Sequence, residues 1–106
     1  MPLIQEVGNP TYDTMATGEI AGSATAAQLP TVACRMVRFK AESANAGNVY
    51  LGTSSSVTKA AGTTSTTCGF ELAPGADSGW LPISNLNLLW RICDNAGDDL
   101  TYWVVQ

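Results

Sequence analysis

The sequence predicts an all-β fold, an antiparallel β-sandwich that is jelly-roll-like and carries an extended N-terminal arm. Short apolar runs recur about every 8–12 residues and are separated by turn residues, which is typical of sandwiches and barrels. No stretch shows the apolar period of about 3.6 residues that marks an amphipathic helix. The chain has 106 residues, the size of one domain, and about seven or eight strands are expected, enough for two small sheets.

Residues 1–29 differ from the remainder and are predicted to form the extended arm. Residues 20–27 are small and weakly apolar, and Gly22 together with β-branched threonines disfavours a helix there. One short strand is expected near residues 18–23. Such an arm buries little surface alone, so it needs a sheet edge or a neighbouring molecule to become ordered.

The β-sandwich domain is predicted over residues 30–106. Apolar residues alternate within 32–41 but change phase, which implies a bulge or a strand that passes between two layers. Residues 53–67 are rich in Thr and Ser and are expected to form a weak strand and a long polar loop. Further strands are expected at residues 49–51, 70–72, 80–83, 86–93 and 100–105, with a Pro-Gly turn at 74–75 and a hairpin loop at 94–99.

Charge and hydropathy argue against two classes of partner. The net charge is −4, and the five cations are scattered, whereas nucleic-acid binding needs clustered Lys and Arg. No window approaches the ~20 consecutive apolar residues of a membrane-spanning helix, and the N-terminus lacks the features of a secretory signal. We therefore expect a protein made in a cytosol, with no nucleic-acid and no membrane partner. Charged residues are only 13% of the chain, which fits a surface covered by oligomerisation or docking, or a neutral Thr/Ser/Gly surface.

The residue types argue against catalysis. The chain has no histidine, so a Ser/His or Cys/His nucleophile pair is excluded. Paired carboxylates could serve glycoside hydrolysis, but every candidate lies at or beside a predicted turn: Glu42, Glu71, Asp77, Asp94, Asp98 and Asp99. We predict no enzyme activity, no catalytic residue and no cofactor.

No metal site is predicted either. The acidic loop offers oxygen ligands of the kind that Ca²⁺ takes, but turns between strands have the same composition, so we favour a turn at Asp94, Asn95, Asp98 and Asp99. The three cysteines, Cys34, Cys68 and Cys93, lack the spacing of a zinc site. Free thiols are favoured, and a disulfide between Cys68 and Cys34 or Cys93 is the alternative.

The aromatic residues suggest a contact surface. Three tryptophans and two tyrosines could form a sugar-stacking platform, but aromatic side chains in sandwiches more often lie in cores or subunit interfaces. Trp80 stands between Ser-Gly and Leu-Pro and is expected to be partly exposed. The residues expected at an interface with another protein or protomer are Leu3, Ile4, Val7, Tyr12, Ile20, Trp80 and Trp103.

Six short motifs in order resemble a family of small bacteriophage head proteins, the capsid decoration or cement proteins. The match covers about residues 30–103, and the Thr/Ser-rich insertion near residues 57–67 departs from the family pattern. The motifs are Pro30-x-Val32-x-Cys34, Val37-x-Phe39-x-Ala41, Asn45-x-Gly47-Asn48-Val49-Tyr50-Leu51-Gly52, Gly69-Phe70-x-Leu72-x-Pro74-Gly75, Leu81-Pro82-Ile83-x-Asn85-Leu86 and Gly97-Asp98-x-Leu100-x-Tyr102.

The resemblance implies a virion structural protein on the outer capsid surface, assembled in the host cytoplasm. It would stabilise the shell by bridging neighbouring subunits of the major capsid protein, as a homotrimer. The alternative is a carbohydrate- or receptor-binding module of a head or tail fibre, which predicts an exposed aromatic cleft. A weaker third alternative is a small glycan-cleaving enzyme that uses Asp98 and Asp99.

Overall fold

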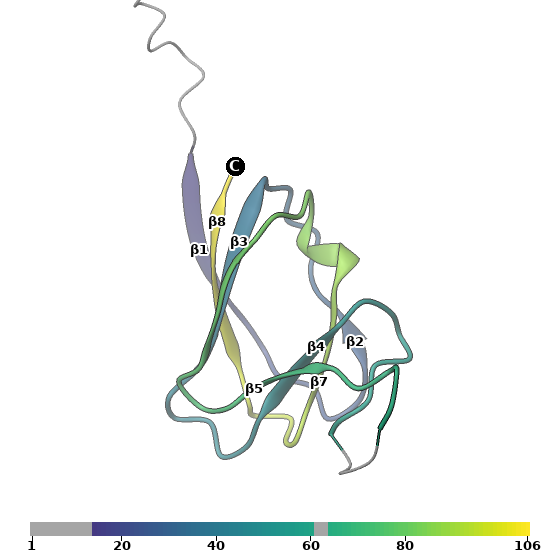
Figure 1. Cartoon of the computed structure of the whole chain (residues 1–106). Helices are drawn as coiled ribbons and strands as arrows, with labels where there is room; N and C mark the ends of the chain where they lie inside the picture. The colour runs from purple at the N-terminus through teal and green to yellow at the C-terminus, as the bar shows by residue number, and fades with distance from the viewer. Residues whose placement is uncertain (1–13, 61–63) are drawn as a thin grey trace, which may run out of the picture.

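The computed structural model describes residues 14–60 and 64–106, and this part of the chain forms two antiparallel four-stranded sheets (Figure 1). The all-β prediction is confirmed. No helix in the described ranges is long and apolar enough to cross a membrane. The elements are β1 (Met15–Ile20), β2 (Ala27–Gln28), β3 (Met36–Ala41), β4 (Val49–Gly52), β5 (Phe70–Leu72), β6 (Asp77–Leu81), the 3-10 helix η1 (Leu86–Leu88), β7 (Trp90–Cys93) and β8 (Leu100–Val105).

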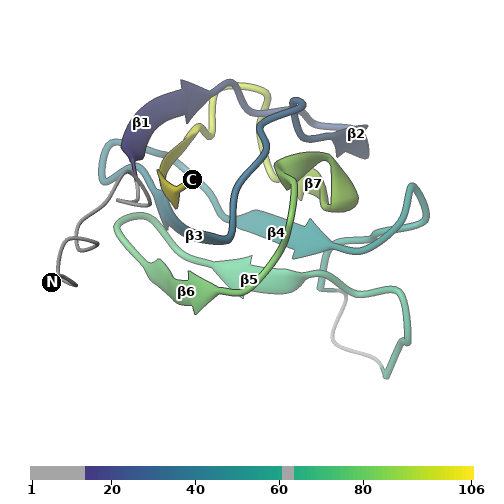
Figure 2. The ribbon, with the colours of Figure 1, turned by 90° about the horizontal axis from the view of Figure 1, so that it is seen from above.

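The strands pair in a nested order. Sheet A has the order β1-β8-β3-β6, and sheet B has the order β2-β7-β4-β5. The first strand therefore pairs with the last, β2 with β7, β3 with β6 and β4 with β5. Two further ladders, β3 with β8 and β4 with β7, join the halves of each sheet. Apart from β4 to β5, each connection carries the chain from one sheet to the other. Figure 2 shows the loop that joins β5 to β6.

The first strand belongs to the sandwich, which corrects the described part of the predicted arm of residues 1–29. β1 pairs along its whole length with β8, from Met15 opposite Val105 to Ile20 opposite Leu100. Two of its inward residues, Ala16 and Gly18, are small. At Gly18 the ring of Tyr102 on β8 fills the space, because an added Cβ would lie 2.5 Å from the tyrosine ring. The weak apolar signal of this strand thus has a packing cause. Residues 1–13 lie outside the described part of the chain.

The core lies between the sheets, and β3 supplies its centre. Val37, Phe39 and Ala41 are fully buried, as their alternation predicts. The phase change within residues 32–41 is a break between two segments, because residues 32–35 precede β3 and the Cys34 N–H bonds to the Ser84 carbonyl. The expected phase change within one strand is therefore corrected. A register shift does occur in this segment, but it lies between Arg38 and Lys40 in the ladder of β3 with β6.

The apolar run 86–93 is also divided. Asn85 caps η1 by accepting a hydrogen bond from the Asn87 N–H through its side chain, and β7 begins only at Trp90. The loop at residues 94–99 joins β7 to β8, which lie in different sheets, so it is not the predicted hairpin loop.

The Thr/Ser-rich segment after β4 packs on the outer side of sheet B. Val57 is 4% exposed and lies over Gly52 and Gly69, where added Cβ atoms would come within 2.4 and 2.9 Å of its side chain. The outward Tyr50 of β4, which is also 4% exposed, lies beside Val57, since the Cβ added at Gly69 would come within 2.8 Å of the Tyr50 Cβ. Sheet B therefore carries part of its own cover on the outer face.

The three cysteines are free, and only one of them is exposed. Burial raises the pKa of the Cys34 and Cys93 thiols, which lowers their thiolate fraction as well as their access to reagents. We therefore expect a thiol reagent to modify Cys68 rapidly in the native protein and the other two only after unfolding. A Cys68→Ser variant should lose the fast phase. Two or more fast-reacting thiols in the native wild-type chain would contradict this arrangement.

Candidate functional site

The outer face of sheet A is built from outward side chains that the strand register aligns in rows. Because inward residues alternate with outward ones, each row runs from β1 across β8 and β3 toward β6. The first row is apolar, the second holds both exposed tryptophans, and the third is mostly charged. The rows are Met15, Val105 and Met36; Thr17, Trp103, Arg38 and Trp80; and Glu19, Thr101, Lys40 and Asp77. We call this set of residues the sheet A face.

Two predicted interface residues, Trp80 and Trp103, come together on the sheet A face. Their ring centroids are 6.0 Å apart and the ring planes are tilted by 60°. The two side chains remain 38% and 46% exposed, respectively. They meet because β6 and β8 flank β3 on either side, and Arg38 of β3 lies between them in the row. Exposed tryptophans in contact form a large apolar surface that the described chain leaves uncovered.

Arg38 is held in place against this tryptophan pair. Its Nε donates to both oxygens of Asp77, at 2.9 and 2.8 Å, and its guanidinium carbon lies 5.9 Å from the Trp80 ring centroid. The pKa of the Asp77 carboxyl is lowered, mainly by the hydrogen bond that the Gly79 N–H donates to it and then by Arg38. Gly79 has a φ of +72°, a left-handed conformation that favours glycine at this position. An exposed ion pair of this kind is worth only about 0–1 kcal/mol, so its main effect is to orient Arg38.

A hollow of about 690 Å³ lies beside Trp103 on the same face. Its lining includes Arg38 and Lys40, which are cationic, and Glu19 and Asp77, which are anionic. The hollow therefore offers both signs of charge next to an exposed indole ring. Such a lining suits a partner with mixed polar and apolar character.

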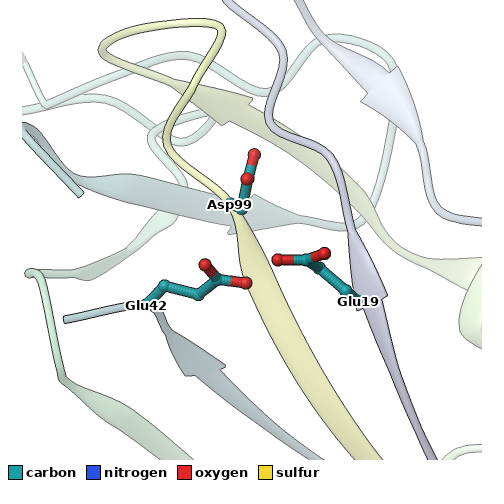
Figure 3. A group of neighbouring side chains, drawn as sticks. All are labelled: Glu19, Glu42 and Asp99. Carbon is teal, nitrogen blue, oxygen red and sulfur yellow. The ribbon is translucent and has the colours of Figure 1, made fainter. Parts of the chain in front are cut away.

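Three carboxylates gather at one end of the sheet A face. Oxygens of Glu19, Glu42 and Asp99 all lie within 4.8 Å of one another, and Figure 3 shows the carboxylates of Glu19 and Glu42 pointing toward each other. Asp99 also accepts a hydrogen bond from the Gly22 N–H at 2.8 Å. Oxygen ligands at this spacing are of the type that Ca²⁺ and Mg²⁺ take. Three ionised carboxylates this close repel one another, and a bound cation would relieve that repulsion. A proton shared by the two glutamates relieves it as well.

The pKa of Glu42 is raised to about 6, mainly by hydrogen bonding with Glu19, then by burial and by the charges of Glu19 and Asp99. Two ionised carboxylates can only accept hydrogen bonds, so the bond between Glu42 and Glu19 forms when one of them is protonated. The Oε2 atom of Glu42 is buried and has no hydrogen-bond partner among the described residues.

We expect the free energy of unfolding to decline as pH rises from about 4.5 to about 6. The folded state holds the Glu42 proton more tightly than the unfolded state, whose carboxyl has the ordinary pKa of 4.5, so this stabilisation is complete below 4.5 and is lost as pH passes 6. Urea titrations across this range check it. In Glu42→Gln the decline should vanish, and an unchanged decline in that variant would contradict the assignment.

The acidic loop at residues 94–99 has a different role. Asp98 is 1% exposed and accepts hydrogen bonds from the backbone N–H groups of Ala46, Gly47 and Asn95. Both of its oxygens are thereby occupied, as the turn interpretation of this loop expects. Asp98 ties the β7–β8 connection to the loop that precedes β4 and has no oxygen free for a ligand.

The other predicted site residues do not join this face. Ile20 is buried in the core at 4% exposure, so its side chain cannot reach a partner, which corrects its assignment to an interface. Trp90 and Tyr50 lie in sheet B, so the aromatic residues do not form a single platform. The positions Leu3, Ile4, Val7 and Tyr12 lie outside the described residues. Sequence reasoning missed Met15, Met36 and Arg38 as members of the face, and only the strand order aligns them with the tryptophans.

Comparison of the chain with protein-family models, curated proteins and solved structures found no match.

Proposed function

We propose that this chain is a virion structural protein of a bacteriophage, a capsid decoration or cement protein. It binds the outer capsid surface through the sheet A face and bridges neighbouring subunits of the major capsid protein, as a homotrimer. The observation that carries this proposal is the exposed Trp80–Trp103 pair, with Arg38 between the strands, on an uncovered sheet face.

The composition of this face supports a protein partner. Trp, Met and Arg are enriched at the centres of protein interfaces, whereas Lys, Glu and Asp are depleted there and suit the rim. The first two rows of the sheet A face hold Met15, Met36, both tryptophans and Arg38. The charged row beyond them has the composition of a rim. This gradient fits one docked surface.

The strand order gives independent but weaker support. We infer that the nested pairing of β1 with β8 through β4 with β5 is that of a jelly roll, an eight-stranded double sheet that occurs in viral capsid and lectin domains. One fold serves many functions, so this strand order is consistent with a virion protein but does not identify a binding site.

Bridging accounts for how so small a chain would stabilise a shell. A trimer that carries three copies of the sheet A face attaches at several points, and each further contact forms at high effective concentration. No single contact then needs high affinity. The low charge content of the chain, 13%, fits surfaces that are covered in an assembly.

Particles that lack the chain test the proposal. Purified protein should bind them at saturating stoichiometry, and the refilled particles should release their genome at a higher temperature than the bare ones. A chain that does not bind bare particles, or is missing from finished virions, would overturn the proposed function.

A carbohydrate-binding role is the second candidate, and the hollow beside Trp103 favours it. Sugar rings stack on exposed indoles, and the neighbouring Glu19, Lys40 and Thr101 would bond to hydroxyl or acidic groups. Quenching of tryptophan fluorescence by a panel of saccharides, with no binding to bare particles, would favour this candidate over the capsid.

A further inference from the structure

A second apolar surface lies on the side of the sandwich, between β5 and β6. Phe70 of β5 is 66% exposed, although it has the same inward phase as Leu72, which is buried. It borders an apolar pocket of about 220 Å³ together with Leu51, Leu81 and Leu89. We call this pocket and its bordering residues the β5–β6 mouth. It is a place where the space between the sheets opens to solvent.

Both strands that border the mouth are edge strands. Within the described ranges β5 pairs only with β4, and β6 pairs only with β3, so each ends its sheet. Edge strands carry backbone N–H and C=O groups that can pair with an added extended segment. A segment laid along either edge would direct an apolar side chain into the mouth. The geometry therefore suits an extended peptide with one or two apolar residues.

The thirteen residues that precede Thr14 provide such a peptide. They include Leu3, Ile4 and Val7 and no Lys or Arg. A segment of this length spans at most about 45 Å when extended, which is enough to reach an adjacent molecule. The segment leaves the sandwich at β1, which ends sheet A on the side opposite β6. To reach its own mouth over sheet A it would have to cross the sheet A face and cover the tryptophan pair.

We propose that residues 1–13 of one copy occupy the β5–β6 mouth of the next copy and place Leu3 and Ile4 against Phe70. The donated segment and the accepting mouth lie on opposite edges of sheet A, so the contact is heterologous, and repeated head-to-tail contacts close into a ring when the rotation allows. This inference rests on the homotrimer of the proposed function and names the site at which the copies join.

Full-length variants test the contact by mass in solution. Wild type at micromolar concentration should show about three times the chain mass of 11.1 kDa. Leu3→Asp with Ile4→Asp, and separately Phe70→Ser, should each reduce the mass to that of one chain. Leu88→Ser is the matched control, because Leu88 is 53% exposed and lies outside the mouth, and it should stay trimeric. A monomeric wild type, or trimers that persist in both mouth and segment variants, would overturn the inference.

Disulfide trapping decides which copy donates the segment, and it does not depend on the oligomer surviving a substitution. In a Cys68→Ser background, which removes the exposed native thiol, Leu3→Cys with Phe70→Cys should form a disulfide between chains under mild oxidation. Bands of two and three chains without reductant are expected. Leu3→Cys with Leu88→Cys should give none. A bond within one chain, or no bond, would overturn exchange between copies.

The two proposals fail in distinguishable ways. If the trapped trimer forms but does not bind bare particles, the exchange of segments is supported and the capsid role is excluded. If the chain binds particles but stays monomeric and no disulfide between chains is trapped, the capsid role is supported and the exchange of segments is excluded.

Discussion

Replacement of Asp98 by alanine is expected to lower the free energy of unfolding by at least about 3 kcal/mol. The carboxylate is 1% exposed and accepts from the N–H groups of Ala46, Gly47 and Asn95 at 3.0, 3.0 and 2.8 Å. All three hydrogen bonds are partly buried, and a hydrogen bond to a charged group contributes about 1.5–3 kcal/mol. Urea unfolding at pH 7 measures the loss. Asp98→Asn should also be destabilising, because a carboxamide replaces one acceptor oxygen with a donor.

The matched control is Asp94→Ala in the same loop. Asp94 is exposed and accepts one N–H, that of Asn48 at 2.8 Å, so its removal should cost less than about 1.5 kcal/mol. Equal losses at the two positions would contradict the burial argument. Burial alone would raise the pKa of Asp98, but the hydrogen bonds from Gly47, Asn95 and Ala46 outweigh it and lower that pKa. The stabilisation by Asp98 is therefore complete above pH 3.8 and is lost as pH falls through the lowered pKa.

The sandwich could be predicted from the sequence because its central strands alternate strongly. Val37, Phe39 and Ala41 show the pattern of β3 without help from their neighbours. The last strand is recognised instead by its run of aromatic and β-branched residues after a turn. β1 could not be found in the same way, because its inward residue Gly18 is small to admit the ring of Tyr102. Where the side chain of a neighbouring strand fills the space inside a strand, the residue facing it is small and the strand shows no clear apolar alternation.

The candidate site was only partly predictable for a related reason. Single residues such as Trp80 and Trp103 could be selected from residue type and expected exposure, but their contact depends on β6 and β8 flanking β3. The carboxylates of Glu19, Glu42 and Asp99 come from three separate parts of the chain and meet only because β1, β8 and β3 are adjacent. Sheet order is set by long-range pairing, which local periodicity does not encode.

Alanine substitution of Trp80 or of Trp103 is expected to weaken binding to bare capsids by about 30-fold each, provided that the proposed function holds. A central interface tryptophan contributes at least about 2 kcal/mol on truncation, which corresponds to this factor. Because the rings are in contact, at a centroid distance of 6.0 Å, the double variant should lose less than the sum of the two single losses. Titration of labelled protein onto particles measures the three affinities.

Stability and binding can be separated at these positions. Each tryptophan is 38–46% exposed, so urea unfolding of every variant beside the binding titration separates a loss of stability from a loss of binding. Leu88→Ala is again the control, since Leu88 is 53% exposed on η1 and does not belong to the sheet A face, and it should bind as wild type does. If the tryptophan variants fill the particles at wild-type concentrations, the sheet A face is not the capsid contact. If saccharide quenching is lost in the same variants while particle binding persists, the face binds sugar instead.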